Sequence, residues 1–249
     1  MTKQEIADSV RLLAQAWRSR TRIEGLSASP ASVAEAHAIQ DQVAAVLGET
    51  IGAFKANAPP DIAPTRGLIY ARMIRRSPAR ISPAETPYLG VEGEIAFRFM
   101  RDLPAQAKPY ARDEIAAAVA VLPAIEVVSS RFHDPYSRSP LEQLADCMIN
   151  GALVIGSEIL DWSQLDLPRL HVALLVNDKP VLERQGRHPT DDPLAVAVAL
   201  VNMMRDAGGV KAGQLVTTGS WTELRRLRSG DRCAVQFEKL GSAQVLFAD

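Results

Sequence analysis

The clearest pattern along the chain is a strict alternation of residue types over residues 91–99, VEGEIAFRF. In a β-strand, successive side chains point to opposite faces, so the odd positions from Val91 to Phe99 share one largely apolar face. Glu92 and Glu94 share the other face with two further residues. A second apolar run, PAIEVVSSRF at 123–132, predicts another strand with Glu126 in its interior. The two strands together therefore present three glutamates.

The first fifth of the chain has a helical pattern instead. Apolar residues recur at helical spacing between Ile6 and Trp17, and Thr2 or its neighbours could cap the start of this helix. Ser29-Pro30 opens a second predicted helix through about Leu47, where Gly48 is a plausible stop signal.

The rest of the chain mixes short strands with scattered helices. The patterns predict strands at 50–56, 67–71, 151–159 and 214–220, helices at 111–121, 139–149 and 191–204, and hairpins at 169–186 and 232–247. The first hairpin should turn at Asn177-Asp178. Because no regular strand–helix–strand repeat is visible, we expect an α+β fold. Proline is frequent over residues 57–90, and we expect a smaller N-terminal part over 1–80 and a core over 81–249.

Composition narrows the functional classes. The 249 residues carry a formal net charge of -1, which gives no general attraction to nucleic acid or to anionic lipid. No segment approaches the ~20 apolar residues of a membrane-spanning helix, and the N-terminus does not resemble a signal peptide. Cys147 and Cys233 lie far apart and form no CxxC motif, so a disulfide framework is not expected. We expect a cytoplasmic protein without nucleic-acid or membrane partners.

The three glutamates are candidates for a metal site. Glu92 and Glu94 should lie about 7 Å apart along one strand face, at ~3.3 Å per residue, and two such charges repel each other. A divalent cation such as Mg²⁺ or Mn²⁺, which prefers oxygen ligands, would remove this conflict. Spacing alone leaves two other readings open, namely a solvent-exposed acidic strand face and a buried ion pair between Glu126 and an arginine.

Several separated segments together resemble a known family. These are AHAIQDQVA, GAFKAN, VEGEIAFRFMRDLP, LPAIEVVSSRF, LADCMINGALVIG and the long C-terminal run that begins LVTTGSWTELRR. In order and spacing they are similar to the group of 2-keto-4-pentenoate hydratases and 2-oxo-3-hexenedioate decarboxylases, within the fumarylacetoacetate hydrolase superfamily. The resemblance covers nearly the whole chain. It implies a mixed β-roll or barrel-like core with flanking helices, a homo-oligomer, and a metal held by Glu92, Glu94 and Glu126.

The resemblance also implies roles for four further residues. Lys55 matches a strand lysine that binds the substrate or assists proton transfer, and Asp146 matches an aspartate that orients water or shuttles a proton. Thr218 and Ser220 match positions that bind substrate oxygens. Without the resemblance these four would be read as a surface or ion-paired lysine, a helix-end aspartate and turn residues.

The implied activity is that of a metal-dependent lyase on a small 2-oxo acid from aromatic-compound breakdown. A metal-bound 2-oxo acid can form an enolate, which serves either water addition by a hydratase or loss of CO₂ by a decarboxylase. Two further alternatives are an acylpyruvate-type C–C hydrolase and a relative that has lost catalysis. The hydrolase would need a base such as a histidine–glutamate pair, for which Glu35 and His37 are a weak match because they lie only two residues apart on a helix.

Three departures from the family pattern fall near the expected substrate pocket. Ser129 stands where an aspartate is usual, residues 147–150 replace Ala-Ser-Ser-type residues, and Ala56-Asn57 replaces Ile-Gly. These changes leave the substrate and the reaction open. The four histidines show no metal-ligand spacing, and we expect His188 at the surface or in a cap.

Overall fold

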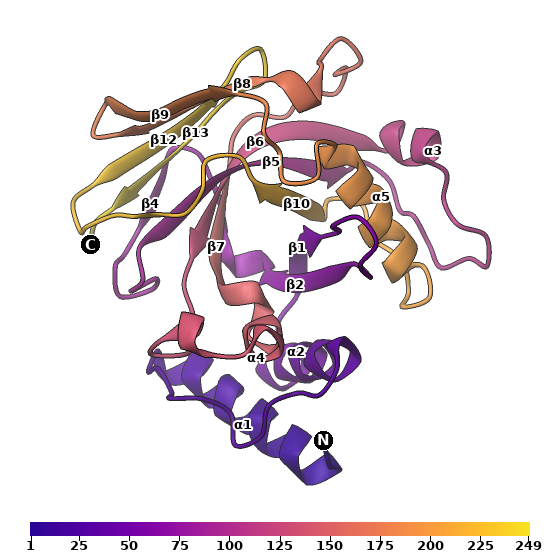
Figure 1. The fold of residues 1–249 in the computed structure, drawn as a ribbon, viewed down its shortest axis with the longest axis vertical. Helices are drawn as coiled ribbons and strands as arrows, with labels where there is room; N and C mark the ends of the chain where they lie inside the picture. The colour runs from indigo at the N-terminus through magenta and orange to yellow at the C-terminus, as the bar shows by residue number, and fades with distance from the viewer.

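Two β-sheets form the centre of the fold in the computed structural model, which describes residues 1–249 (Figure 1). The larger sheet has eight strands in the order β2-β1-β10-β5-β6-β7-β3, with β11 added beside β5. Its strands are β1 (Ile51–Asn57), β2 (Thr65–Tyr70), β3 (Ile74–Arg76), β5 (Gly90–Phe99), β6 (Val119–Val128), β7 (Asn150–Ile155), β10 (Leu215–Ser220) and β11 (Arg225–Arg226). The β1–β10 and β7–β3 pairs are parallel, and the other pairs are antiparallel.

The smaller sheet has five strands in the order β4-β13-β12-β8-β9. They are β4 (Ala79–Ile81), β8 (His171–Val176), β9 (Lys179–Gln185), β12 (Arg232–Phe237) and β13 (Gly241–Phe247). Strands β12 and β13 lie against β6, so one face of each sheet is buried against the other. The main hydrophobic core fills this space, and it includes Val91, Phe97, Val127, Val235 and Phe247. This mixed, curled arrangement confirms the expected α+β fold.

The other face of the larger sheet is also covered, although part of it is polar. Small and medium apolar residues such as Ala53, Ala96 and Ala124 form a separate buried cluster there. By strand register, Glu92, Glu94 and Glu126 lie farther along this same face. The expectation that this face could be open to solvent is therefore wrong: Glu94 and Glu126 are fully buried.

The helices cover two sides of the sheets. Helix α5 (Pro193–Met204) packs on β10 and β1, whereas α1 (Lys3–Ser19), α2 (Val33–Leu47) and α4 (Pro140–Ala145) form the lower layer in Figure 1. The remaining helix, α3 (Arg112–Ala116), is short and contacts α5. None of these helices combines the length and the apolar character that crossing a membrane requires.

Most predicted elements are present, although several borders are shifted, as in β6, expected over 123–132 and found at Val119–Val128, and in three helices. The helix expected over 111–121 ends at Ala116, because Val119–Val128 pairs along its whole length with β5. Helix α2 begins at Val33 rather than near Pro30, since Ser32 is the residue that caps it. Helix α4 stops at Ala145, because residues 147–149 adopt positive φ angles of 54° to 55°. The expected turn at Asn177-Asp178 is confirmed, since both residues have the positive φ of a tight hairpin turn.

Candidate metal centre

Three carboxylates converge on the polar end of the larger sheet. Glu92 and Glu126 are direct cross-strand partners on β5 and β6, and Glu94 lies two residues along the same face. One oxygen from each carboxylate lies within 4.8 Å of the other two. The structure therefore brings together the three glutamates that the sequence singled out.

Lys55 approaches the carboxylates from β1. Its Nζ atom lies 3.0 Å from Glu126 Oε1 and 3.6 Å from Glu92 Oε2. The buried ion pair that was an alternative to a metal site at Glu126 is thus present, but its cation is a lysine rather than an arginine. One ammonium group cannot balance three carboxylates, so the cluster keeps an excess of negative charge or of protons.

The pKa values in the cluster show the same imbalance. Burial raises the pKa of Glu94 well above its usual range, and the nearby Glu126 carboxylate raises it further. Burial also raises the pKa of Glu92, against the opposing effect of Lys55. For Lys55 itself, burial would lower the pKa, but the three carboxylates outweigh burial and raise it above the ordinary value. A lysine that takes part in proton transfer needs a lowered pKa. The three carboxylates instead raise the pKa of Lys55 and hold it as a charged ammonium group.

Two buried carboxylate oxygens in the cluster have no hydrogen-bond partner, Glu94 Oε1 and Glu126 Oε2. The other oxygen of each group is held by the protein: Gly219 N donates to Glu94 Oε2 at 3.0 Å, and Asn150 Nδ2 donates to Glu126 Oε1 at 3.1 Å. Buried acceptors are costly unless they are paired, and a divalent cation is a partner that takes oxygen ligands. The residues present therefore fit a divalent metal ion.

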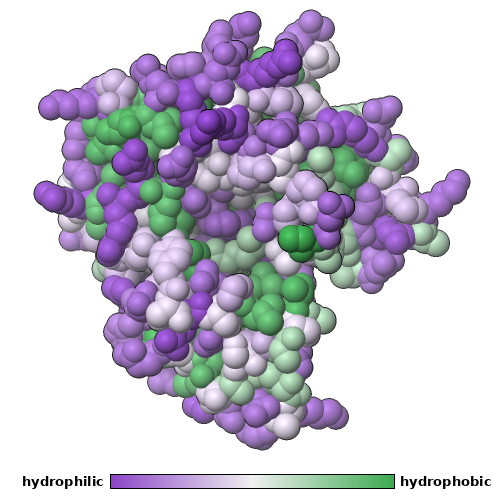
Figure 2. All heavy atoms as spheres, viewed as in Figure 1, coloured by the Kyte–Doolittle hydropathy of each residue, from purple (hydrophilic) through white to green (hydrophobic).

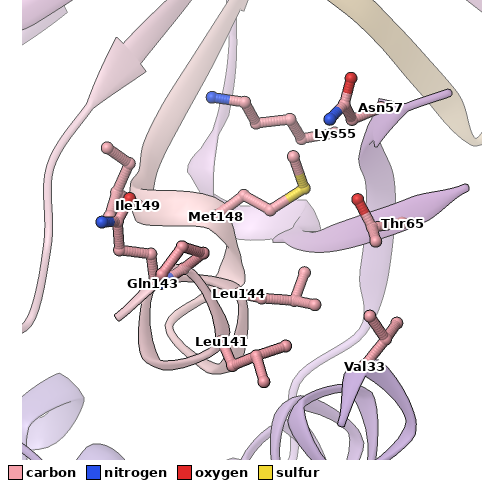
Figure 3. Close-up of a pocket in the computed structure, with 10 residues that line it drawn as sticks. Val33, Lys55, Asn57, Thr65, Leu141, Gln143, Leu144, Met148 and Ile149 are labelled. Atoms are coloured by element: carbon pink, nitrogen blue, oxygen red, sulfur yellow. The ribbon is translucent and has the colours of Figure 1, made fainter. Parts of the chain in front are cut away.

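A cavity of about 420 Å³ is lined by Lys55, the residue that contacts Glu92 and Glu126 (Figure 3). Lys55 and Asn57 lie at one end of it, Val33, Leu141 and Leu144 at the other, and Met148 between them. Lys55 therefore links the carboxylate cluster to a cavity whose size is typical of a small-molecule site.

Asp146 lies in a buried ion pair away from this cavity. Arg131 binds its Oδ1 through Nε, while Ser130 Oγ and Arg131 N donate to its Oδ2 at 2.6 and 3.0 Å. Arg131 also donates to the carbonyl groups of Asp146 and Asn150, at 2.8 Å in each case. Both carboxylate oxygens of Asp146 are thus occupied, and the contacts connect β6 with the turn that leads into β7.

The two predicted residues of β10 differ in placement. Thr218 is buried, and its hydroxyl donates to the carbonyl of Ile95 at 2.9 Å, so it is committed to the neighbouring strand. Ser220 pairs with Glu94 in the strand register, and its hydroxyl acts to lower the pKa of Glu92. The structure therefore brings Ser220 to the carboxylates but turns the Thr218 side chain into a structural contact.

Some residues near the site had no role assigned to them from the sequence. Gly219 has a φ of +118°, which favours glycine, and this conformation presents its amide to Glu94. The pKa of Tyr136 is raised to about 12. Burial is the main cause, Tyr88 is the second, and the Glu92 carboxylate also contributes. His188 was expected at the surface, but it is only 3% exposed and its Nε2 lies 2.8 Å from the Thr218 carbonyl.

The residues that differ from the family pattern lie in two separate places. Asn57, Met148 and Ile149 line the cavity beside Lys55. Ser129 instead lines a separate recess of about 50 Å³ next to Arg131 and Trp17. Trp221, which directly follows β10, is fully buried against Phe237 and is a core residue.

Comparison with known proteins identifies the family. A profile described as Fumarylacetoacetate (FAA) hydrolase C-terminal matches residues 53–246, which is most of the chain. The chain therefore belongs to the fumarylacetoacetate hydrolase family, as the sequence motifs indicated.

Similar proteins include characterised enzyme classes of this family. The chain is 30% identical to 2-keto-4-pentenoate hydratase 1 of Dechloromonas aromatica (strain RCB), over 74% of this chain and 70% of that one. It is 30% identical to the 2-hydroxyhexa-2,4-dienoate hydratase of Comamonas testosteroni, over 64% and 60%. In structure it is similar to the 4-oxalocrotonate decarboxylase from Pseudomonas putida G7 complexed with magnesium and adipate, with a TM-score of 0.84 and 19% identity, over 99% of this chain and 98% of that one.

Proposed function

We propose that this protein is a divalent-metal-dependent hydratase that adds water to a 2-hydroxy-2,4-dienoate, or to the 2-oxo-enoic acid in equilibrium with it. The observation that carries the proposal is the cluster of Glu92, Glu94 and Glu126, which has two unpartnered buried oxygens and contacts Lys55, a residue that lines an open cavity. The 30% identity to a 2-keto-4-pentenoate hydratase over 74% of the chain supports the reaction type.

The proposed metal ligands are the three glutamates, and Mg²⁺ or Mn²⁺ is the expected ion. Such an ion supplies a Lewis acid that stabilises negative charge on a 2-oxo acid. Gly219 and Asn150 each hold one carboxylate oxygen in place, which leaves the other oxygen of Glu94 and Glu126 directed to a ligand. The magnesium in the similar Pseudomonas putida decarboxylase structure supports this assignment.

Lys55 is the proposed cation for the substrate carboxylate. Lys55 lines the cavity, and Glu126 and Glu92, which its Nζ contacts, hold it charged. Ser220 is the proposed hydroxyl group for a remaining substrate oxygen, because it lies opposite Glu94 in the strand register and lowers the pKa of Glu92. Asp146 and Thr218 act in this proposal as positioning residues, since their polar side-chain atoms already have protein partners.

Two alternatives have unequal support. A decarboxylase of a 2-oxo-3-enedioate keeps a specific argument in its favour, because a 4-oxalocrotonate decarboxylase has the same fold over nearly its whole length. The acylpyruvate hydrolase lacks its expected base: Glu35 binds the chain amino group and the Ala31 amide, and His37 accepts a hydrogen bond from the Arg66 amide.

The proposal is tested with 2-hydroxypenta-2,4-dienoate, whose ultraviolet absorbance disappears on hydration. We expect loss of absorbance with Mg²⁺ or Mn²⁺, no turnover after treatment with EDTA, and a hydrated 2-oxo acid as the product by NMR. CO₂ release from 2-oxo-3-hexenedioate, with no turnover of the dienoate, would instead establish the decarboxylase. Turnover of neither compound with either metal would reject the proposed function.

A further inference from the structure

The cavity beside Lys55 carries information about the substrate beyond its 2-oxo acid group. Of the ten residues that line it, five are hydrophobic, and Lys55 is the single charged one. Lys55 already contacts Glu126 at 3.0 Å and Glu92 at 3.6 Å. Pro140 and the neutral polar residues Asn57, Thr65 and Gln143 complete the wall.

We infer that this cavity is the subsite for the substrate tail, and that it selects an uncharged, largely apolar tail of several carbon atoms over a tail that ends in a carboxylate. This inference rests on the proposed function, in which the 2-oxo acid group lies at the three glutamates. It goes further because it names the chemistry of the opposite end of the substrate.

A second carboxylate in the tail would find no free cation among the residues that line the cavity. A carboxylate that leaves water needs a cation or several hydrogen bonds, and one buried without them is costly. Arg66, which follows the lining residue Thr65 in the chain, is bound to both oxygens of Asp41 at 2.8 Å. The far end of the cavity is formed by Val33, Leu141 and Leu144, which offer contact only to apolar groups (Figure 3).

The size of the cavity indicates a tail longer than one or two carbon atoms. Its volume is about 420 Å³, whereas a water molecule in the liquid takes about 30 Å³. A short tail would leave most of this apolar wall in contact with water. A tail of several carbon atoms or an aromatic ring would remove that surface from water, which is favourable in proportion to the apolar area buried.

Met148 is the proposed specificity-determining residue. It projects into the middle of the cavity from a turn in which Cys147, Met148 and Ile149 all have left-handed φ angles, an unusual backbone state for non-glycine residues (Figure 3). Gly67 makes the turn possible, because a Cβ atom there would lie 2.4 Å from the Cys147 carbonyl oxygen. Methionine is unbranched and adaptable, so it can move against tails of different shape.

The cavity wall combines two parts of the chain. Val33 belongs to α2, which precedes the family match at residues 53–246, whereas Lys55 and Met148 lie within it. On the face seen in Figure 2, the surface is hollowed between the sheet and the N-terminal helices, with hydrophobic residues on the lower wall. Helix α2, through Val33, and helix α4 thus close the end of the cavity that would meet the tail.

The test measures binding of 2-oxo acids that share one head group and differ in the tail. Calorimetric titration of the Mg²⁺-loaded protein would compare 2-oxobutanoate, 2-oxooctanoate and 2-oxoadipate. We expect 2-oxooctanoate to bind at least tenfold more tightly than 2-oxobutanoate, and 2-oxoadipate to bind no more tightly than 2-oxobutanoate. Tightest binding of 2-oxoadipate, or equal affinity for all three, would overturn the inference.

A pair of variants tests whether the preference originates in this cavity. Gln143→Lys places a cation in the wall at a half-buried position, and Gln143→Met is the neutral control of similar length. We expect Gln143→Lys to improve 2-oxoadipate affinity at least tenfold and Gln143→Met to leave it unchanged. An unchanged 2-oxoadipate affinity in Gln143→Lys would show that the tail lies elsewhere.

Oxalate separates failure of this inference from failure of the proposed function, because it has the chelating oxygens but no tail. Metal-dependent oxalate binding with a flat response to tail length would reject the tail subsite alone. Absence of oxalate binding in the metal-loaded protein would reject both the proposed function and the inference. Equal oxalate affinity in wild type and in both Gln143 variants would show that the variants are folded.

Discussion

At the scale of single residues, Glu94 and Glu126 divide their oxygens between two tasks. In each carboxylate one oxygen accepts a hydrogen bond from the protein, and the other is buried without a partner. The held oxygen fixes the orientation of the group, so the free oxygen is aimed before any ligand arrives. Asn150 performs this task for Glu126, although the sequence marked it only as part of a departure from the family pattern.

Replacing Asn150 by alanine should therefore weaken metal binding without removing a ligand. Partners of metal ligands typically contribute a factor of about 10 to 100 in affinity, and we expect a loss of that order in Mn²⁺ affinity by calorimetry. Asn202→Ala is the control, because Asn202 bonds only Tyr110. Equal Mn²⁺ affinity in Asn150→Ala and wild type would contradict an orienting role.

Asp146→Asn tests whether Asp146 positions the chain or takes part in the reaction. The substitution leaves the Arg131 guanidinium buried without its anion, and breaking such a pair costs about 3–5 kcal/mol. We expect a decrease of that order in the free energy of unfolding, measured with urea. A variant with wild-type stability and no activity would instead support the proton-transfer role that the family resemblance implied.

The glutamate cluster was accessible from sequence because strand geometry has a period of two and Glu126 lies in an apolar run. The contacts that hold these glutamates could not be predicted, because they join segments far apart in the chain. Gly219 donates to Glu94, and Lys55 pairs with Glu126. The substrate-binding role that the motif implied for Thr218 stays a prediction, and the sequence did not show that its hydroxyl donates to the Ile95 carbonyl.

At the scale of elements, the loop between β9 and α5 supports the end of β10. His188 in this loop bonds the Thr218 carbonyl at 2.8 Å and packs against Trp221, with ring centroids 5.6 Å apart. The next residue after Thr218 is Gly219, whose amide holds Glu94. The loop therefore contributes to the geometry of the site without facing it.

This buried histidine predicts a loss of stability in mild acid. Burial lowers the pKa of His188 to about 4, against the opposing effects of Asp192 and Asp191. The unfolded chain takes up the proton near pH ~6.5, so it binds more protons than the folded chain between these values, and stability falls as pH decreases through this interval. We expect the loss to reach about 3 kcal/mol at pH ~4.

Urea unfolding of wild type and His188→Gln across this pH range isolates the effect. The difference in unfolding free energy between the two proteins should shrink as pH falls, because glutamine does not titrate. Parallel pH profiles would show that His188 is not held neutral in the folded protein.

Element borders were predicted less well than element types. The helix expected over 111–121 ended early because the pairing of β6 with β5 extends to Val119 opposite Phe99. Local periodicity could not show this, since an alanine- and valine-rich segment suits either state until its partner strand is known.

At the scale of the whole molecule, the larger sheet joins strands from distant parts of the sequence. Strands β1, β2 and β3 belong to this sheet, and β1 lies between β2 and β10. Helices α1 and α2 instead pack in a separate cluster with Phe132 and Leu144. A division of the chain at residue 80 would cut through the sheet, whereas a division before Ile51 would follow the change from helices to strands.

A fragment of residues 81–249 should therefore not fold alone. It lacks three strands of the larger sheet and the residue Lys55, so β10 and β7 would have unpaired edges. We expect a near-ultraviolet circular dichroism spectrum without fixed aromatic signals and no cooperative thermal transition. A cooperatively folding fragment would support an independent domain over 81–249.

The architecture as a whole was predictable to the level of fold class and family, because several motifs agree in order along the chain. The set of residues that lines the cavity was not predictable, since the cavity wall combines α2, β1, β2 and the segment after β6. The homo-oligomer implied by the resemblance stays a prediction, which light scattering of the purified protein would check.

The most direct test of the central claim is a titration of Mn²⁺ into wild type, Glu126→Gln and Glu238→Gln, followed by calorimetry. Glu238 is an exposed glutamate in the turn between β12 and β13, so its variant is a matched control. We expect one site per chain in wild type and Glu238→Gln, and an affinity at least about 100-fold lower in Glu126→Gln, because a buried ligand oxygen is lost. Equal stoichiometry and affinity in all three proteins would contradict a metal centre at Glu92, Glu94 and Glu126.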